Sequence, residues 1–148
     1  MKRLSLIAIA LISVLFFMGC ATPPPAAPTN SVEEALHEVY QRFRGDIILI
    51  GASRHTVVAG ETLAAISSRH YPDGFYYPLI MLASSAVVLD PDRIEPGMVL
   101  TIPDLDRNMN SARARASMRE FFFEIATIEE NRGRAATANG IRTHARAM

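Results

Sequence analysis

The chain has 148 residues, of which 49% are hydrophobic, and its 15 acidic side chains balance 15 basic ones to a formal net charge of zero. This length suits one small domain, and a chain with a single cysteine has no intramolecular disulfide, so the domain needs an apolar core. The arginine-rich part that begins at Arg107 has no interleaved aromatic side chains to stack on bases, which argues against a nucleic-acid-binding protein.

The first twenty residues have the pattern of an export signal. Lys2 and Arg3 precede an apolar run over residues 4–18, which is too short to span a bilayer comfortably. The run ends in FMGC and resembles the signal of a bacterial lipoprotein, although Phe17 stands where Leu, Val or Ile is usual. The resemblance implies that residues 1–19 are removed and that Cys20 is lipidated. The alternative is an uncleaved signal anchor.

Residues 20–30 follow as a proline-rich segment with almost nothing apolar to bury. Proline stiffens such a segment toward the polyproline II conformation, so we expect a tether that holds the folded part off the membrane. The protein is therefore expected to be exported and lipid-anchored on the periplasmic face of the cell envelope. Whether the inner or the outer membrane carries the anchor stays open.

Residues 31–53 are expected to form a helix and a short strand. Val32, Leu36, Val39 and Phe43 fall on one face of a helix that ends near residue 45. The sequence DIILI, residues 46–50, then indicates a short apolar strand or extended run.

The next region, residues 54–104, begins with β-branched residues at positions 56–58, which favour a strand. Gly60 permits a tight turn, and Thr62 can cap a helix whose inner face carries Leu63 and Ile66. Pro78 suits the first turn of a second helix, and this helix is apolar nearly all round, so we expect it to be buried.

A final strand is indicated at residues 98–102, where alternating side chains are ended by Pro103. The order strand, helix, helix, strand lets the two strands pair antiparallel with both helices on one face. The predicted fold class is therefore α+β, with additional helices before and after the βααβ unit.

Two blocks of this region resemble the lysin motif, or LysM, family. The sequence TVVAGETLAAIS is similar to the family pattern TVxxGDTLxxIA, and IEPGMVLTIP is similar to IxPGQxLxIP. Glu61 stands where the family usually has Asp, and Ser84 stands where it usually has Asn. The resemblance implies a βααβ architecture and binding of N-acetylglucosamine polymers, which means peptidoglycan for an exported bacterial lipoprotein.

The resemblance also implies a glycan-binding groove between the loop after the first strand and the loop before the last strand. Carried over by position, the residues of this groove are Gly60, Glu61, Thr62, Leu63, Ile94, Glu95 and Pro96. Each has a structural alternative, because Gly60, Thr62 and Pro96 can serve the turns alone. Leu63 and Ile94 can equally be core residues.

No catalytic or metal-binding constellation is found, and no cofactor is implied. The four histidines, His37, His55, His70 and His144, are scattered without the spacing of zinc ligands. Three tyrosines near the Pro-Gly loop either line a sugar site or pack at its rim: Tyr71, Tyr76 and Tyr77.

Residues 105–148 are expected to be helical. One helix over residues 108–133 can be capped by Ser111 and ended by Gly133, and residues 134–148 can form a last helix. The first of these carries an apolar stripe that either packs on the rest of the protein or binds a protein partner. The stripe consists of Met118, Phe121, Phe122, Ile125 and Ile128.

Together these features predict a non-catalytic lipoprotein that binds peptidoglycan and tethers the membrane to it, or locates partners there. The alternative is a scaffold protein, in which the LysM-like fold is structural and the flanking helices bind a partner.

Overall fold

The computed structural model describes residues 30–148, and side chains from residue 32 onward. The expected signal peptide, the lipidated Cys20 and the tether lie outside these residues. No helix within residues 30–148 is long and apolar enough to cross a membrane. The elements in chain order are α1 (Asn30–Phe43), β1 (Ser53–Thr56), α2 (Leu63–His70), the short 3-10 helix η1 (Gly74–Tyr76), α3 (Tyr77–Ala83), β2 (Val99–Ile102), α4 (Leu105–Asn110), α5 (Ala112–Asn131) and α6 (Ala135–Ala147).

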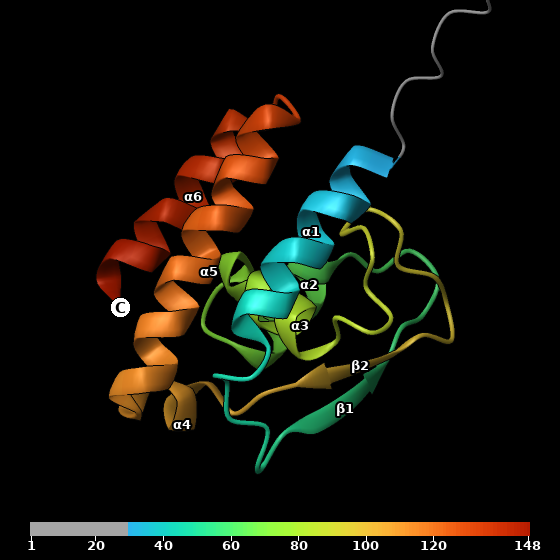
Figure 1. Ribbon diagram of the computed structural model, residues 1–148. Coiled ribbons are helices and arrows are strands. Elements are labelled where there is room, and N and C mark those ends of the chain that lie inside the picture. Colours follow the sequence, from blue (N-terminus) through green and yellow to red (C-terminus); the bar gives the residue numbers. More distant parts are fainter. Residues whose placement is uncertain (1–29) are drawn as a thin grey trace, which may run out of the picture.

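The two strands form an antiparallel sheet, with Ser53 opposite Ile102 at one end and Thr56 opposite Val99 at the other. Helices α2 and α3 cover one face of this sheet (Figure 1). Leu100 and Ile102 of β2 are buried beneath them. The predicted α+β class and βααβ order are therefore confirmed.

Local sequence explains how both covering helices begin. The hydroxyl of Thr62 accepts a hydrogen bond from the backbone N–H of Ala65 at 3.2 Å, as expected of the residue that caps α2. Pro78 lies in the first turn of α3, where its missing N–H costs no hydrogen bond. Every residue from Tyr77 to Leu82 is buried, which confirms that α3 is a core helix.

The strand expected over residues 46–50 is wrong. Within residues 30–148 no strand pairs with this segment; instead Asn108 of α4 bonds the backbone of Ile48. The N–H of Ile48 donates to Oδ1 of Asn108 at 2.8 Å, and the Ile48 carbonyl accepts from Nδ2 at 2.9 Å. A buried side-chain amide thus takes the place of a neighbouring strand.

Two boundaries also differ from the sequence-based expectation. The first strand ends at Thr56, and Val57 and Val58 belong to the turn that follows it. The helix expected over residues 108–133 is divided at Ser111, whose extended backbone separates α4 from α5. Ser111 still caps α5, because its hydroxyl accepts from the N–H of Ala114 at 3.3 Å.

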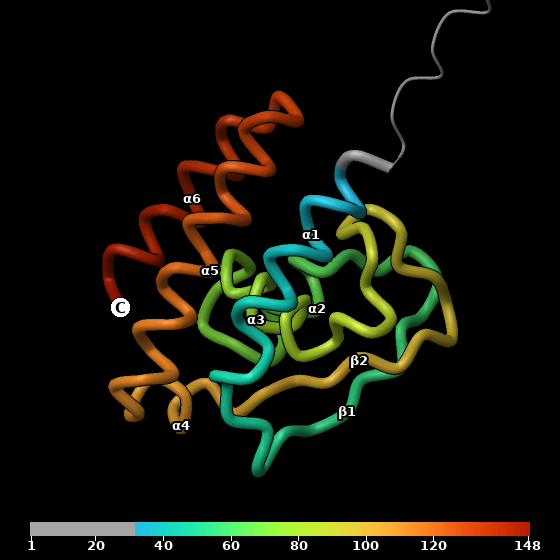
Figure 2. Tube along the Cα trace, in the orientation of Figure 1, coloured from blue at the N-terminus to red at the C-terminus, as the bar shows by residue number. Residues whose placement is uncertain are grey.

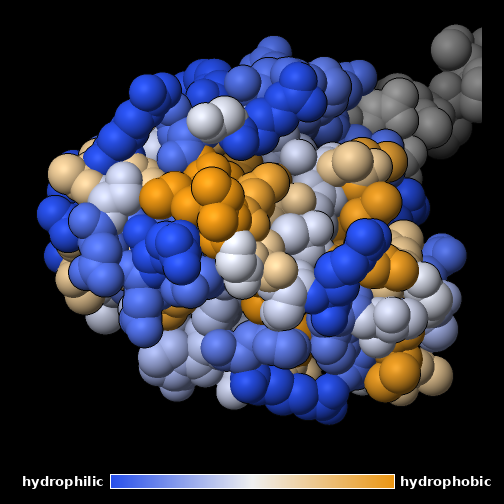
Figure 3. Space-filling view, turned by 90° about the horizontal axis from the view of Figure 1, so that it is seen from below, coloured by the Kyte–Doolittle hydropathy of each residue, from blue (hydrophilic) through white to orange (hydrophobic). Residues whose placement is uncertain are grey.

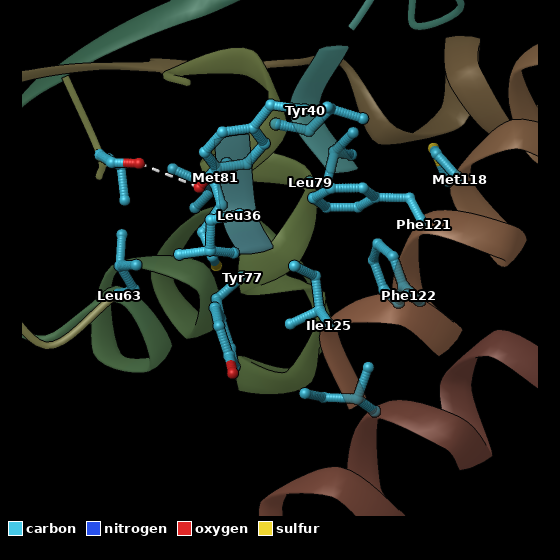
Figure 4. Packing of buried hydrophobic residues seen from close by; sticks show 14 of the residues in the cluster. Leu36, Tyr40, Leu63, Tyr77, Leu79, Met81, Met118, Phe121, Phe122 and Ile125 are labelled. Atoms are coloured by element: carbon cyan, nitrogen blue, oxygen red, sulfur yellow. Dashed lines mark hydrogen bonds between the residues drawn. The ribbon is translucent and has the colours of Figure 1, made fainter. Parts of the chain in front are cut away.

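The apolar stripe of α5 is packed inside the protein. Phe121 lies 6.0 Å from Tyr40 and 5.8 Å from Phe43 of α1, measured between ring centroids. Phe122 lies 6.2 Å from Tyr76. Both phenylalanines are fully buried, and Figure 4 shows them facing α1 and α3 residues. Of the two expectations for this stripe, packing is confirmed and a free docking face is wrong.

The flanking helices α1, α5 and α6 lie on the side of the sheet that α2 and α3 cover, and the other face of the sheet is open (Figure 1). Figure 2 shows α1 running beside α5, although some seventy residues separate them in the sequence. Helix α6 packs back on α5 through Ala138, Ile141 and Ala145, which are fully buried.

Replacement of Leu82 by alanine tests this core. Leu82 is 1% exposed, and truncation of a buried leucine usually costs about 2–5 kcal/mol of the free energy of unfolding. Leu89→Ala is the matched control, because Leu89 is 54% exposed. Thermal or urea unfolding should show a large loss for Leu82→Ala and little change for Leu89→Ala. Equal unfolding midpoints would contradict the packing of α3.

Candidate functional site

The two loops that the sequence singles out lie side by side at one end of the sheet. The N–H of Val57 donates to the carbonyl of Met98 at 2.9 Å, and the N–H of Gly97 donates to the carbonyl of Val57 at 2.8 Å. These bonds continue the pairing of β1 and β2 past the last strand residues. They bring residues 58–62 next to residues 94–97, at the end of the sheet remote from α4 (Figure 1).

Gly60 gives the first loop its shape. Its φ of +84° lies in the left-handed region, which side chains other than glycine rarely adopt. A Cβ atom at this position would meet nothing within 4 Å, so the space in front of Gly60 is open. The turn closes through a hydrogen bond of 3.2 Å from the N–H of Glu61 to the carbonyl of Val58.

The side chain of Glu61 is engaged within the protein and only 4% exposed. Its Oε2 lies 2.8 Å from Nε2 of His55 and accepts from the N–H of Val58 at 2.9 Å. Its Oε1 pairs with Arg69 of α2. The hydrogen bonds from His55 and Val58 lower the pKa of Glu61 from 4.5 to about 2. Glu61 therefore holds the loop through its side chain, which faces the protein; its role as a glycan contact stays a prediction.

Of the remaining two residues expected in the first loop, Thr62 is exposed and Leu63 is buried. Thr62 is exposed and caps α2, and because its hydroxyl accepts in this cap, the hydroxyl hydrogen is left to donate. Leu63 is 3% exposed and belongs to the core. Leu63 thus packs as a core residue, which is the structural alternative to its expected place in the groove.

The second loop presents a mixed surface. Glu95 and Pro96 are exposed, while Ile94 is half-buried and packs against the core. The side of the molecule that carries the two strands shows apolar patches within a hydrophilic surround (Figure 3). Two large hydrophobic side chains are exposed near the loops. Val58, in the first loop, is 56% exposed, and Val99, the first residue of β2, is 38% exposed. Four of the seven expected groove residues are therefore exposed: Gly60, Thr62, Glu95 and Pro96.

A pair of histidines lies behind Glu61 and was not anticipated from the sequence. Nδ1 of His55 lies 3.4 Å from Nε2 of His70, and the two rings meet edge to face. The His55 ring is thus held between the Glu61 carboxylate at Nε2 and the His70 ring at Nδ1. Burial and the nearby His55 and Arg69 lower the pKa of His70. The chain His70–His55–Glu61 braces the first loop.

Ser84, which departs from the family pattern, fastens α3 to β2. Its hydroxyl accepts from the N–H of Thr101 at 2.9 Å and lies 3.4 Å from the carbonyl of the same residue. The residue is 4% exposed. A short serine is therefore sufficient to hold the end of α3 on the sheet, and the contact does not reach the two loops.

An ionic cluster ties the loop before β2 to the turn between α5 and α6. Arg134 donates to Asp92 at 2.8 Å and to the buried Glu129 at 3.2 Å. Arg132 donates to Asp90 at 3.1 Å and also pairs with Asp92. Hydrogen bonding to Arg134 lowers the pKa of Asp92, whereas burial raises the pKa of Glu129. The C-terminal helices thereby fix residues that lie just before Ile94.

Other features of the described residues lie away from the two loops. Within residues 30–148, no three or more His, Cys, Asp or Glu side chains are placed to hold a metal ion. A hollow of about 470 Å³ lies between α1 and residues 85–89. Another of about 380 Å³ lies near Ser53 and Asp104, at the opposite end of the sheet from Gly60.

The anchored carboxylate predicts a pH-dependent difference between the protein and Glu61→Gln. Because the folded-state pKa of Glu61 is lowered from 4.5 to about 2, its stabilising contribution is present above pH 4.5 and is lost as the pH falls toward 2. Melting temperatures of the two proteins should therefore differ most at neutral pH and converge on acidification. Glu34→Gln removes an exposed carboxylate of α1 as a control. A gap that widens in acid would contradict the anchoring role.

Comparison with known proteins agrees with this geometry. The LysM domain family matches residues 55–103, about a third of the chain. Esterase Rv1288 of Mycobacterium tuberculosis strain H37Rv is 47% identical over 55 residues, which is 37% of this chain and 12% of the esterase. Potassium binding protein Kbp of Escherichia coli O6:H1 is 42% identical over 50 residues, 34% of each chain. No solved structure matches.

These similarities are local, because the matched segment spans about an eighth of the esterase and a third of the potassium-binding protein. The shared part is the βααβ unit and not the helices around it. Residues 55–103 are therefore a LysM domain, built here between an N-terminal helix and a C-terminal group of three helices.

Proposed function

We propose that the chain binds the N-acetylglucosamine-containing glycan of peptidoglycan without catalysis and holds a membrane, or proteins bound to it, at the cell wall. A LysM domain is a glycan-binding domain, and peptidoglycan is among its ligands. The more specific parts of the proposal are the two loops as the contact surface and a lipid on Cys20 as the anchor.

One observation carries the proposal for the loops. Gly60 and Thr62 on one side, and Glu95 and Pro96 on the other, are exposed next to each other. Their backbones are held from behind by the Glu61 contacts and by the bonds between Val57 and residues 97 and 98. A preformed surface loses little conformational entropy on binding, which favours recognition of a flexible polymer.

The chemistry of this surface suits an N-acetylated sugar. The hydroxyl of Thr62 accepts one hydrogen bond within the protein and still has its hydrogen to donate to an acetamido oxygen. Pro96 and the exposed part of Ile94 offer apolar contact for an acetyl methyl group or a sugar face. Open space in front of Gly60 lets a ligand approach the backbone closely.

The scaffold alternative has less support. It needs a free apolar face on the flanking helices, and the stripe of α5 is buried against α1 and α3. Gly60, Thr62, Glu95 and Pro96 of the two loops, in contrast, are exposed. The esterase similarity covers only 12% of that enzyme, so it supplies no argument for hydrolysis by this chain.

A single shallow surface of this kind should bind short N-acetylglucosamine oligomers weakly. We expect a dissociation constant between about 10 μM and 1 mM, which corresponds to roughly −4 to −7 kcal/mol. Weak binding suffices if a lipid on Cys20 confines the domain near a repeating polymer, because confinement raises its effective concentration.

Gly60→Arg tests the loop surface against Gly60→Ala. Both variants carry the same backbone strain at φ +84°, but only arginine places a long charged side chain in front of the loop. Cosedimentation with purified peptidoglycan is measured on the full chain in mild detergent. The Gly60→Arg protein should no longer sediment with peptidoglycan, whereas the Gly60→Ala protein should still do so. If folded Gly60→Arg protein sediments like the parent, the loops do not bind glycan.

Cys20→Ala tests the anchor. Cys20 is the only cysteine of the chain, so its thiol is the only acceptor of this type. Metabolic labelling with a fatty acid in a bacterial host should label the parent and not the variant, and the variant should accumulate as unprocessed precursor. Two or more acyl chains hold a protein firmly, whereas one binds only marginally. A labelled Cys20→Ala protein would refute the proposed anchor.

A further inference from the structure

Two histidines from different elements bring ring nitrogens together beside the sheet. His55 lies in β1, and His70 is the last residue of α2. Nδ1 of His55 and Nε2 of His70 are 3.4 Å apart, and the planes of the two rings meet at 83°. His55 is half-buried, whereas His70 is exposed. The pair is thus held firmly on the His55 side and is reached from solvent on the His70 side.

The separation of these two nitrogens is long for a hydrogen bond and suits two ligands of one metal ion. The donor and acceptor atoms of protein hydrogen bonds usually lie about 2.7–3.2 Å apart. Zinc binds imidazole nitrogen at about 2.0–2.1 Å, so two nitrogens on a tetrahedral ion lie about 3.3 Å apart. The exposed ring of His70 can turn slightly to direct its lone pair at such an ion.

The contact with Glu61 determines which nitrogen of His55 can bind an ion. Nε2 of His55 lies 2.8 Å from Oε2 of Glu61. The pKa of Glu61 is lowered to about 2, so its carboxylate is ionised at neutral pH and only accepts hydrogen bonds. The proton between the two groups therefore belongs to Nε2. In the neutral imidazole the lone pair is then on Nδ1, the nitrogen that faces His70.

A carboxylate on the far side of a histidine is the usual companion of a metal ligand. It fixes the tautomer and the orientation of the ring and raises the basicity of the other nitrogen. Glu61 is itself held in place, because it accepts from the N–H of Val58 at 2.9 Å and pairs with Arg69. Glu61 and His55 therefore have the arrangement of an outer carboxylate and a ligand.

The charges around the pair are compatible with a bound cation. Both rings must be neutral to bind an ion, and partial burial, with the charges of His55 and Arg69, lowers the pKa of His70 against the opposing charge of Glu61. The guanidinium of Arg69 also repels a cation. It is paired with Glu61 and more than half exposed, so solvent screens this repulsion.

We propose that Nδ1 of His55 and Nε2 of His70 bind a late first-row divalent metal ion such as Zn²⁺, with Glu61 as the outer carboxylate. Imidazole suits zinc, copper and nickel. Within residues 30–148 no set of three or more such groups is placed to hold a metal, so water completes the coordination. His70 borders the hollow of about 380 Å³ near Ser53, which gives the ion and its water molecules access.

An ion at this position links β1 to the end of α2. Glu61 also holds the N–H of Val58 in the first loop, so the ion stabilises the same arrangement that braces this loop. An ion that binds the folded chain and not the unfolded chain raises the stability of the fold. Two protein ligands make a weaker site than the four of a structural zinc site. The site does not depend on the glycan-binding function proposed above.

His70→Gln is the main test variant, because His70 is exposed and its replacement leaves the core unchanged. His55→Gln removes the other ligand, and Glu61→Gln removes the charge of the outer carboxylate while keeping its shape. His37→Gln is the matched control, since His37 is an exposed histidine of α1. All proteins carry Cys20→Ala, so that this thiol cannot bind the ion, and none carries a polyhistidine tag.

Calorimetric titration with zinc chloride at neutral pH uses the full chain in mild detergent. We expect saturable binding of one ion per chain, and a melting temperature that rises with zinc and returns after EDTA is added. His70→Gln and His55→Gln should remove both effects. Glu61→Gln should weaken zinc binding about tenfold or more, as is usual for the outer partner of a metal ligand. His37→Gln should bind zinc like the parent.

The outcomes that would overturn the proposal are distinct. If the parent does not bind one zinc ion per chain, or if His70→Gln binds zinc as tightly as the parent, the two histidines share a hydrogen bond only. If Glu61→Gln binds zinc like the parent, Glu61 is not an outer partner of the ion. If His37→Gln loses the binding, the ion lies on α1. His70→Gln decides the question even where His55→Gln fails to fold.

Discussion

Helix α3 is buried on every side, and the rest of the described structure is arranged around that constraint. One side of this short helix rests on β2, to which Ser84 fastens its end. A two-stranded sheet and one more short helix do not provide enough surface to cover the remaining sides, and isolated small sheets are marginally stable. Helices α1 and α5 supply the cover, through Tyr40 and the phenylalanines of α5. The flanking helices are thus part of the folding unit.

This dependence links the C-terminal helices to the loops at the end of the sheet. Once α5 is packed on α3, the turn between α5 and α6 lies beside the loop that precedes β2. Arg132 and Arg134 pair there with Asp90 and Asp92. The buried Glu129 joins the same cluster, where two guanidinium groups offset the cost of its desolvation. Packing brings the loop and the turn together, and charge pairing then restricts the loop.

The first loop is restricted by different means. Its acidic residue, Glu61, accepts from a neighbouring backbone N–H and from His55, and so faces the protein. A residue type that looks suited to ligand binding in the sequence therefore has a structural role. The surface left for a ligand consists of backbone and small side chains, with Gly60 and Thr62 foremost. Such a surface suits polymers with repeated amide groups, which can be recognised by shape and a few hydrogen bonds.

Local pattern determined much of this protein. The Thr62 cap, the buried character of α3, the Ser111 cap and the order of the βααβ elements could all be predicted, because each depends on residues within one or two turns of each other. Only the tertiary structure decided the rest. Asn108 pairs with Ile48 in place of a strand, and Arg134 reaches Asp92 across forty-two residues. These contacts join segments whose separation along the chain carries no periodic signal, so their distances exist only in the folded state.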